Sequence, residues 1–442
     1  MKYDKFFALA KEAGIEEAEL YIGNSRSLAI SMFHGQIENY SDNNGYTILA
    51  RGLINGRCGT ASCDVWNAEK AKYLVDEIAA NAKVIENDDP IFIFEGSPKY
   101  KKVHTFNKEL ANVSIDKKIE ALKLLEQKVI DSDPRIKVMQ GVEVEYRETE
   151  SSTTILNSKG LKLTEKGNYF VYIASAVAKE GEQVKSGYDL YLGNEFDKFN
   201  VEELAKKVCD NVVSQLGGEA CQSGNYKAVL SPDVVASLLS FYVDSADAEE
   251  IQKHSSLFIG KLNQKVASSK VTVEDRPLSK NVFARAFDDE GVATYNKPII
   301  KKGVLQTYLY NLTTAAKDGV QTTGNAVRGG GKMGTAPSFL YMKPGKKSQK
   351  ELFEEIGDGV YITEVQGLHA GMNAQSGNFS LQSTGFLVKN GKKDRALDII
   401  TISGNLVKLF MDIKEVGSDE TVFPSAISCP SVIIKKIAVG GK

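Results

Sequence analysis

Short strand-like runs separated by glycine-containing turns are the feature that most limits how this 442-residue chain can fold. Turns are predicted at 43–45, 55–56, 158–160 and 166–168, where asparagine, serine or lysine stands beside glycine. The strand-like runs cover residues 18–22, 28–33, 46–54, 142–146, 152–157, 169–177 and 188–192. Strands joined by short connections pair antiparallel, so the pattern predicts largely antiparallel sheets.

Helices are predicted between these strands, because apolar residues recur there at a spacing of three and four. The clearest case is 115–130, in which Ile119, Leu122, Leu125 and Val129 fall on one face. The other helices predicted in this half cover residues 3–13, 67–85 and 201–216. The mixture of helices and hairpins indicates an α+β organisation.

The second half is predicted to be richer in strands and loops than in helices. Strands are expected at residues 227–230, 294–302, 305–310, 338–342 and 380–388. The region 319–345 holds seven glycines and two prolines, which predicts a long irregular loop. We therefore predict an α+β chain in two parts, with mixed, largely antiparallel sheets and a β-rich C-terminal domain.

The boundary between the two parts is predicted near residue 225, because Gly217-Gly218 ends a helix and a linker-like stretch follows. The N-terminal α+β region then covers 1–225 and the C-terminal domain 226–442. Within the first region, 1–110 and 111–225 both place a polar strand and a turn before longer strands. A diverged duplication explains this order, and so does chance similarity between two hairpin-rich segments.

Composition argues against several classes of protein. The net charge of −2 and the dispersed basic residues disfavour direct nucleic-acid binding, which needs a basic face. Five scattered cysteines, an odd number, predict reduced thiols and no disulfide framework. The sequence has no signal peptide and no run of eighteen apolar residues, so we expect a cytoplasmic protein with no membrane partner.

The common nucleotide-binding and metal-binding motifs are either absent or lie in the wrong structural context. Gly329, Gly331 and Gly334 form a GxGxxG pattern, but a strand-like run follows it where dinucleotide binding needs a helix. A P-loop is excluded, because Ala326 stands where a glycine is required. HExxH is missing, and the four histidines are far apart: His34, His104, His254 and His369. A metal site would need ligands from distant parts of the chain.

Residues 238–254, LLSFYVDSADAEEIQKH, carry four acids and one histidine on a predicted helix that starts at Ser231-Pro232. Glu250 and His254 are four residues apart, so they can touch on one helical face. One interpretation is a metal-binding or acid–base pair. The other is an exposed ion pair, which the lack of a second nearby histidine favours.

Asp288-Asp289-Glu290-Gly291 is the densest acid cluster in the chain. Three adjacent carboxylates suit a hard cation, but neighbours on an extended chain point in different directions, so a solvated turn is the default expectation. Thr323-Gly324-Asn325 and Arg328 form a second polar cluster. It suits either hydrogen bonding to a peptide backbone or an anion, or closure of a loop. We predict seven contacts for a peptide or partner: Asp288, Asp289, Glu290, Thr323, Gly324, Asn325 and Arg328.

Four stretches in register resemble the TldD/PmbA family: 288–328, which begins DDEGVATYNKP, then 363–392, 401–419 and 427–441. Their order and spacing fit throughout the C-terminal half, whereas the N-terminal half fits mainly in length and element order. The family has two branches. The TldD branch carries a zinc-binding HExxxH helix and a cysteine-containing CGKxGQ-type loop, and the PmbA branch, also called TldE, lacks both.

The helix that corresponds to HExxxH decides the branch. Leu238-Leu239 match the apolar pair ahead of the motif, so its first histidine falls on Ser240, its glutamate on Phe241 and its second histidine on Ser245. A hydroxyl is a poor zinc ligand, and phenylalanine cannot act as a base. The tail up to Cys429 also lacks the CGKxGQ loop. The chain therefore resembles the PmbA branch, with no catalytic residue and no metal of its own.

The resemblance implies a non-catalytic subunit of a heteromeric zinc metallopeptidase that acts on leader peptides or small unfolded proteins. Zinc is then expected in a TldD-like partner and not in this chain, with a homodimer as an option when the chain is alone. Two alternatives stay open. One is a homodimeric peptidase with its own site around Asp288, Glu290 or His254, and the other is a regulator linked to DNA gyrase.

Overall fold

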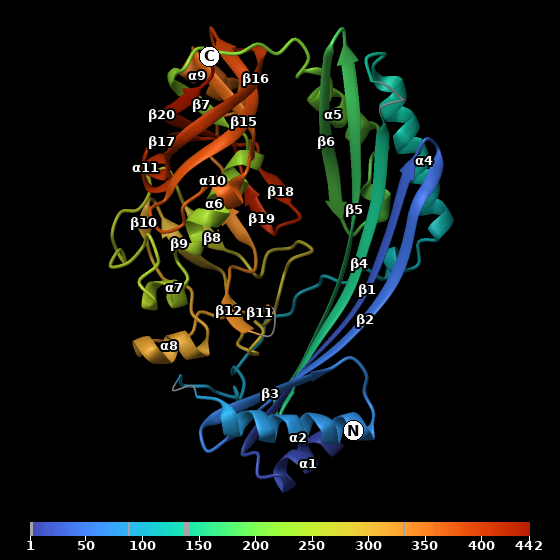
Figure 1. The fold of residues 1–442 in the computed structure, drawn as a ribbon, viewed down its shortest axis with the longest axis vertical. Coiled ribbons are helices and arrows are strands. Elements are labelled where there is room, and N and C mark those ends of the chain that lie inside the picture. The colour runs from blue at the N-terminus through green and yellow to red at the C-terminus, as the bar shows by residue number, and fades with distance from the viewer. Residues whose placement is uncertain (1–2, 87–88, 137–140, 330–331) are drawn as a thin grey trace.

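The computed structural model describes residues 3–86, 89–136, 141–329 and 332–442, and it has the α+β architecture in two parts that the sequence predicts (Figure 1). The N-terminal part is built on one six-stranded antiparallel sheet in the order β3-β2-β1-β4-β5-β6. Its strands are β1 (Glu17–Phe33), β2 (Gln36–Ile54), β3 (Arg57–Cys63), β4 (Val142–Asn157), β5 (Lys162–Glu180) and β6 (Gln183–Gly193). β1 and β4 are neighbours at the centre of the sheet. β2 and β3 follow outward from β1, and β5 and β6 follow outward from β4.

Two of the predicted turns are wrong, because long strands run through them. Asn43-Asn44-Gly45 lies inside β2, where Gly45 is opposite Ser25 of β1. A Cβ on Gly45 would lie 2.6 Å from the Ser25 hydroxyl oxygen, so close approach between strands accounts for this glycine. Lys166-Gly167-Asn168 likewise lies inside β5, with Gly167 opposite Ser151.

The helices of the N-terminal part pack on one face of this sheet. They are α1 (Asp4–Glu12), α2 (Ala68–Val84), α3 (Lys108–Ala111), α4 (Ile115–Ser132), the 3-10 turn η2 (Phe196–Lys198) and α5 (Val201–Val213). Leu20 of β1 is buried with α1 and α2, and Ile30 with α4 and α5, so even-numbered β1 positions face the helices. Odd-numbered positions such as Tyr21 face the C-terminal part, which lies beside the sheet in Figure 1.

The C-terminal part contains two six-stranded sheets of mixed direction, in the orders β10-β9-β8-β13-β19-β18 and β16-β15-β14-β7-β20-β17. Pairing of β16 with β20 closes five strands of the second sheet into a small barrel. The strands are β7 (Gly224–Leu230), β8 (Val273–Asp275), β9 (Lys297–Lys301), β10 (Val304–Leu305), β11 (Ala326–Gly329), β12 (Lys332–Thr335), β13 (Leu340–Met342), β14 (Gly359–Gln366), β15 (Asn378–Lys389), β16 (Lys392–Asn405), β17 (Ile413–Val416), β18 (Thr421–Phe423), β19 (Ile427–Cys429) and β20 (Val432–Gly440).

Helix α6 lies in the middle of this part and packs on β14 and β19. Apolar side chains cover most of its circumference, as expected for a helix enclosed by sheets. The helices here are α6 (Pro232–Asp244), α7 (Ala248–Gln252), α8 (Leu312–Asp318), α9 (Gln349–Ile356), α10 (Leu368–Gly371) and α11 (Leu406–Met411). No helix among the described residues is long and apolar enough to cross a membrane.

The predicted irregular loop over 319–345 is wrong over part of its length. β11 and β12 form an antiparallel hairpin within it, and β13 follows. Arg328 lies opposite Met333 in that hairpin, and Gly331 of the GxGxxG pattern falls outside the described residues. Backbone pairing explains the difference, since a glycine-rich strand is stabilised by its partner and not by its own side chains.

Candidate functional site

Helix α6 starts where the sequence predicts and ends earlier. The Ser231 hydroxyl accepts the Val234 amide, and Pro232 occupies the first turn. The helix stops at Asp244, so the single helix predicted over 238–254 is wrong. The Asp247 carboxylate caps the separate helix α7 by accepting the Glu249 amide at 2.9 Å, which explains the break.

The predicted Glu250–His254 pair does not form in the described structure. His254 lies beyond the end of α7 with a φ of +58°, so it leaves the helical face that carries Glu250. The Glu250 carboxylate accepts the Ser255 hydroxyl and lies 4.0 Å from Lys253 Nζ. Both sequence interpretations of this pair are therefore wrong.

The three α6 positions that align with HExxxH do not fit zinc. Ser240 is half-buried, Phe241 packs against the C-terminal core, and Ser245 is 7% exposed with its carbonyl accepting the Ser256 hydroxyl. They supply no imidazole, thiolate or carboxylate. Throughout 3–86, 89–136, 141–329 and 332–442, no three or more His, Cys, Asp or Glu side chains are grouped so that they could hold a metal ion.

Cys429 is placed at the wrong end of α6 to join those positions. Its Sγ lies 3.2 Å from the Pro232 carbonyl oxygen, and burial raises the pKa of the thiol well above its usual value. Ser240 is eight residues further along, which is about 12 Å at about 1.5 Å per residue. Cys429 therefore belongs to the core around the start of the helix.

A pocket of about 200 Å³ adjoins the end of α6, and acids surround it. Asp244, Asp247 and Glu250 line one side, and Thr335 and Pro337 line the other. Burial, with the charge of Asp247 as a second cause, raises the pKa of Asp244 to about 6. We call these three acids the α6 acid rim.

The Asp288-Asp289-Glu290 cluster is buried, so the default expectation of a solvated turn is wrong. Their residue exposures are 1%, 6% and 2%. Asp288 accepts the amides of Glu290 and Val292 on one oxygen and the Ala326 amide on the other. Its pKa is raised to about 6 by burial, although these amides lower it. Asp288 thus closes the turn and ties it to β11.

Asp289 connects the two parts of the molecule. Its Oδ1 accepts Arg285 Nη2 at 2.7 Å and the Tyr21 hydroxyl of β1 at 3.1 Å, and its Oδ2 accepts the Arg328 amide at 2.7 Å. Arg285 also reaches across to Glu165 of β5, with 2.9 Å between Nε and Oε1. The carboxylate is therefore fully occupied by partners from both parts.

Arg328 and Glu290 extend this junction. Arg328 Nη2 and Arg51 Nε both donate to Oε1 of Glu19, a carboxylate of β1 with no solvent exposure, at 2.7 and 2.8 Å. Glu290 accepts the Leu312 amide at 2.8 Å, and burial raises its pKa to about 7. We call the set Glu19, Tyr21, Arg51, Glu165, Arg285, Asp289, Glu290 and Arg328 the interdomain junction.

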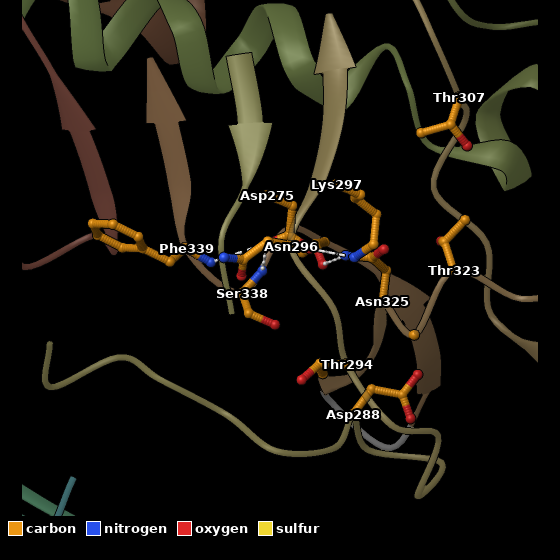
Figure 2. Close-up of polar contacts among 12 residues, drawn as sticks. Asp275, Asp288, Thr294, Asn296, Lys297, Thr307, Thr323, Asn325, Ser338 and Phe339 are labelled. Atoms are coloured by element: carbon orange, nitrogen blue, oxygen red, sulfur yellow. Dashed lines mark hydrogen bonds and ion pairs between the residues drawn. The ribbon is translucent and has the colours of Figure 1, made fainter. Parts of the chain in front are cut away.

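Thr323, Gly324 and Asn325 lie beside a second buried network, drawn in Figure 2. Asn325 Nδ2 donates to Asp275 Oδ2 at 2.8 Å, and Lys297 Nζ lies 2.8 Å from the same oxygen. The Tyr310 amide donates to the Thr323 hydroxyl at 2.7 Å, and Gly324 has a φ of +66° that favours glycine. These predicted contact residues are mostly engaged with their own fold.

Asp275 anchors this network. Its Oδ1 accepts the amides of Ser338 and Phe339 at 2.9 and 3.2 Å, so it links β8 to the approach to β13 (Figure 2). The sequence analysis missed Asp275 and Lys297. The available signal was weak, since other charged residues stand close to each in sequence: Glu274 and Arg276 beside Asp275, and Lys301 in the strand of Lys297.

An open pocket of about 350 Å³ lies between the N-terminal sheet and the C-terminal part, and it is the candidate functional site. Arg285 and Asp289 place the interdomain junction in its wall, and the remaining lining comes from β1, β4 and β5 of the sheet, from Thr105, and from loops near 282–284 and 338. The lining residues are Tyr21, Thr105, Ser151, Thr153, Glu165, Lys166, Gly167, Val282, Phe283, Ala284, Arg285, Asp289 and Ser338. Its polar walls suit main-chain and charged groups of a ligand.

Comparison with known proteins assigns this chain to a family of metallopeptidases. The chain belongs to the PmbA/TldD family. Sequence profiles of the PmbA/TldA metallopeptidase domain 1, central domain and C-terminal domain match residues 18–82, 108–216 and 223–441.

Individual relatives agree with this assignment. A metalloprotease PmbA homologue of Buchnera aphidicola is 27% identical over 96% of this chain and 93% of its own length. A crystal structure of a candidate DNA gyrase modulator from Thermotoga maritima shares 31% identity over 99% of both chains, with a TM-score of 0.91. TldE from Thermococcus kodakarensis has the same fold, with a TM-score of 0.92 over 100% of both chains at 23% identity. The chain falls in the PmbA/TldE branch.

Proposed function

We propose that this chain is the non-catalytic subunit of a two-subunit zinc metallopeptidase in which a TldD-like partner holds the zinc. One observation carries the proposal: α6 keeps its enclosed place in the fold, while Ser240, Phe241 and Ser245 offer neither ligand nor base. The chain then contributes by completing a cavity that admits substrate and by stabilising the partner.

The proposed substrates are leader peptides and small unfolded proteins. The pocket of about 350 Å³ supports this, because it is open to solvent and lined by hydroxyl, backbone and charged groups of both parts. Such groups hydrogen-bond an extended main chain with little dependence on its sequence. The junction around Asp289 supplies a rigid floor.

The rival idea of an independent peptidase receives no support from its suggested residues. Asp288 and Glu290 are buried and accept backbone amides, so neither is placed to activate a water molecule on an external peptide. His254 ends a short helix and is not paired with Glu250. A role with gyrase would have only the description of a relative behind it.

The test compares this chain, a TldD-like subunit from the same genome and their mixture on an unstructured peptide. We expect the mixture to cleave faster than the TldD-like subunit alone, this chain alone to be inactive, and zinc to follow the TldD-like subunit in elemental analysis. A mixture whose TldD-like subunit has Gln for the motif glutamate is the matched control and should be inactive. Cleavage by this chain alone at the rate of the mixture would refute the proposal.

A further inference from the structure

The face of the N-terminal sheet opposite its helices carries an apolar strip on the last two strands. Val171 is opposite Leu192 and Ile173 is opposite Leu190, at the positions of β5 and β6 that alternate with the residues under α4 and α5. Val171 is buried, Ile173, Leu190 and Leu192 are half-buried, and Tyr188, two residues before Leu190, is 57% exposed. We call these five residues the β5–β6 strip.

Polar side chains stand beside the strip on the neighbouring strands. On β4, Arg147 and Glu145 stand opposite Val171 and Ile173 and pair with each other at 2.6 Å. On β1, the positions opposite Arg147 and Glu145 are Ala29 and Ser31. The apolar side chains are therefore concentrated on β5 and β6, where Val177 and Val184 continue the face, and an apolar patch beside polar surface is typical of a binding surface.

The outer edge of β6 is not open for simple strand addition. Asn211 Nδ2 donates to the Tyr188 carbonyl at 2.9 Å, and Gln215 Nε2 donates to the Ser186 carbonyl at 3.3 Å. The Leu190 amide donates to the Asp189 carboxylate at 2.7 Å. Side chains thus occupy main-chain groups that a pairing strand would need, so a ligand meets the strip through side chains on its face.

Two carboxylates of the C-terminal part stand near the exposed end of the strip. They are Asp233 in the first turn of α6 and Glu364 on β14, and after burial their charges are the next causes that raise the pKa of Tyr188. In the described part of the chain neither carboxylate has an ion-pair partner, and Glu364 accepts only the Gln366 amide group, at 2.8 Å. Uncompensated negative charge beside an apolar surface favours a cationic ligand.

Strand β5 connects the strip to the interdomain pocket. Glu165 and Gly167 line that pocket, and Tyr169 contacts the Phe283 ring of its wall with 6.2 Å between centroids. Val171 and Ile173 continue the same face of the strand. Gly167 and Ile173 are six residues apart, or about 20 Å at about 3.4 Å per residue, so the surface matches about six residues of an extended chain.

We propose that the β5–β6 strip is a docking surface for an extended polypeptide segment that carries both apolar and basic side chains. The apolar side chains pack on Ile173, Leu190 and Tyr188, and a lysine, arginine or amino terminus meets Asp233 and Glu364. The proposal rests on the proposed function, since a subunit that admits unstructured substrates needs such a surface. It specifies which substrates this subunit selects, namely segments with both apolar and basic side chains.

The test uses the full chain alone and fluorescein-labelled, unstructured twelve-residue peptides in which leucine and serine are interspersed with either lysine or glutamate. Fluorescence anisotropy at low salt should give about tenfold tighter binding of the lysine peptide, a difference that added salt reduces. Leu190→Asn should weaken that binding about tenfold, and so should Asp233→Asn combined with Glu364→Gln.

The matched controls are Ile37→Asn and Glu38→Gln on β2, both exposed and separated from the strip by β1 and β4. Both should bind the lysine peptide like the unaltered chain. Equal affinity for the two peptides, or unchanged affinity in the strip variants, would overturn the proposal. So would a change in molar mass of Leu190→Asn without a change in peptide affinity, because the strip would then be an interface between copies. Binding measured without a partner keeps this result separate from the cleavage assay, which tests the proposed function.

Discussion

Two acid-rich regions of the C-terminal part, the α6 acid rim and the 288–290 turn, carry the same kinds of side chain in opposite surroundings. In the rim, Asp244 is exposed and borders an open pocket with Asp247 and Glu250. In the turn, all four carboxylate oxygens of Asp288 and Asp289 accept hydrogen bonds. The number of donors that face a carboxylate, and not the density of acids along the chain, decides whether it holds the fold together.

The contrast also separates the residues that join the two parts of the molecule from the residues of helix α6. The turn and Arg328 tie the C-terminal part to Glu19 and Tyr21 of the sheet, so they preserve the pocket between the parts. At the α6 positions where the resemblance puts the HExxxH motif, Ser240, Phe241 and Ser245 supply no zinc ligand.

The largest expected effect is loss of the junction carboxylate in Asp289→Ala. This change deprives Arg285, Tyr21 and the Arg328 amide of an acceptor in a buried setting, and it should lower the free energy of unfolding by about 4 kcal/mol. Asp42→Ala is the matched control, because Asp42 pairs with Arg26 at the surface and should cost under about 1 kcal/mol. Chemical denaturation of both variants measures the difference, and similar small losses would contradict the contrast.

A second, smaller effect is expected in the pH dependence of stability. Burial raises the pKa of Glu290 to about 7, whereas the unfolded carboxyl titrates near about 4.3. The folded chain therefore holds this proton more tightly, and the contribution of Glu290 to stability falls as pH rises between these values.

Glu290→Gln removes that dependence, so the stability of the variant relative to the unaltered chain should rise by about 3 kcal/mol across the window. Melting temperatures between about pH 4.5 and about pH 7.5 measure it, with exposed Glu38→Gln as the control. A difference that stays flat with pH would show that Glu290 is not perturbed.

The acid rim should respond far less. Asp244→Asn removes a carboxylate whose charged form is disfavoured by partial burial and, second, by Asp247. Because the residue is still largely exposed, the change should stabilise the chain by under about 1 kcal/mol above about pH 6. At lower pH, where Asp244 is protonated, the effect should vanish. Melting temperatures at the two pH values test this, and a loss of several kcal/mol would mean that the rim supports the fold as the turn does.

No effect at all is expected on metal content when Ser240→His is combined with Ser245→His. Two imidazoles still lack a third ligand, because Cys429 lies at the start of α6. Elemental analysis after dialysis should find no stoichiometric zinc, with a TldD-like subunit as the positive control. If the double variant does not fold, Ser240→His alone, at a half-buried position, replaces it in the measurement. One bound zinc per chain would contradict the conclusion that α6 lacks a third ligand.

The pattern of runs and turns was sufficient for the α+β class and for the amphipathic helices, since local periodicity reports which face each element buries. It failed at Asn43-Asn44-Gly45, where pairing with β1 overrides local turn preference, and at the end of α6, where the Asp247 cap starts a new helix. The division near residue 225 and the duplication stay predictions.

Side-chain chemistry alone established that Ser240, Phe241 and Ser245 cannot form a zinc site, because a ligand's identity does not depend on its neighbours. The role of the acids was settled only in three dimensions. Glu19 meets Arg328 across 309 residues of sequence, and Tyr21 meets Asp289 across 268. Burial and hydrogen bonding arise from such distant contacts, so no local pattern could have distinguished the carboxylates of the junction from those of the rim.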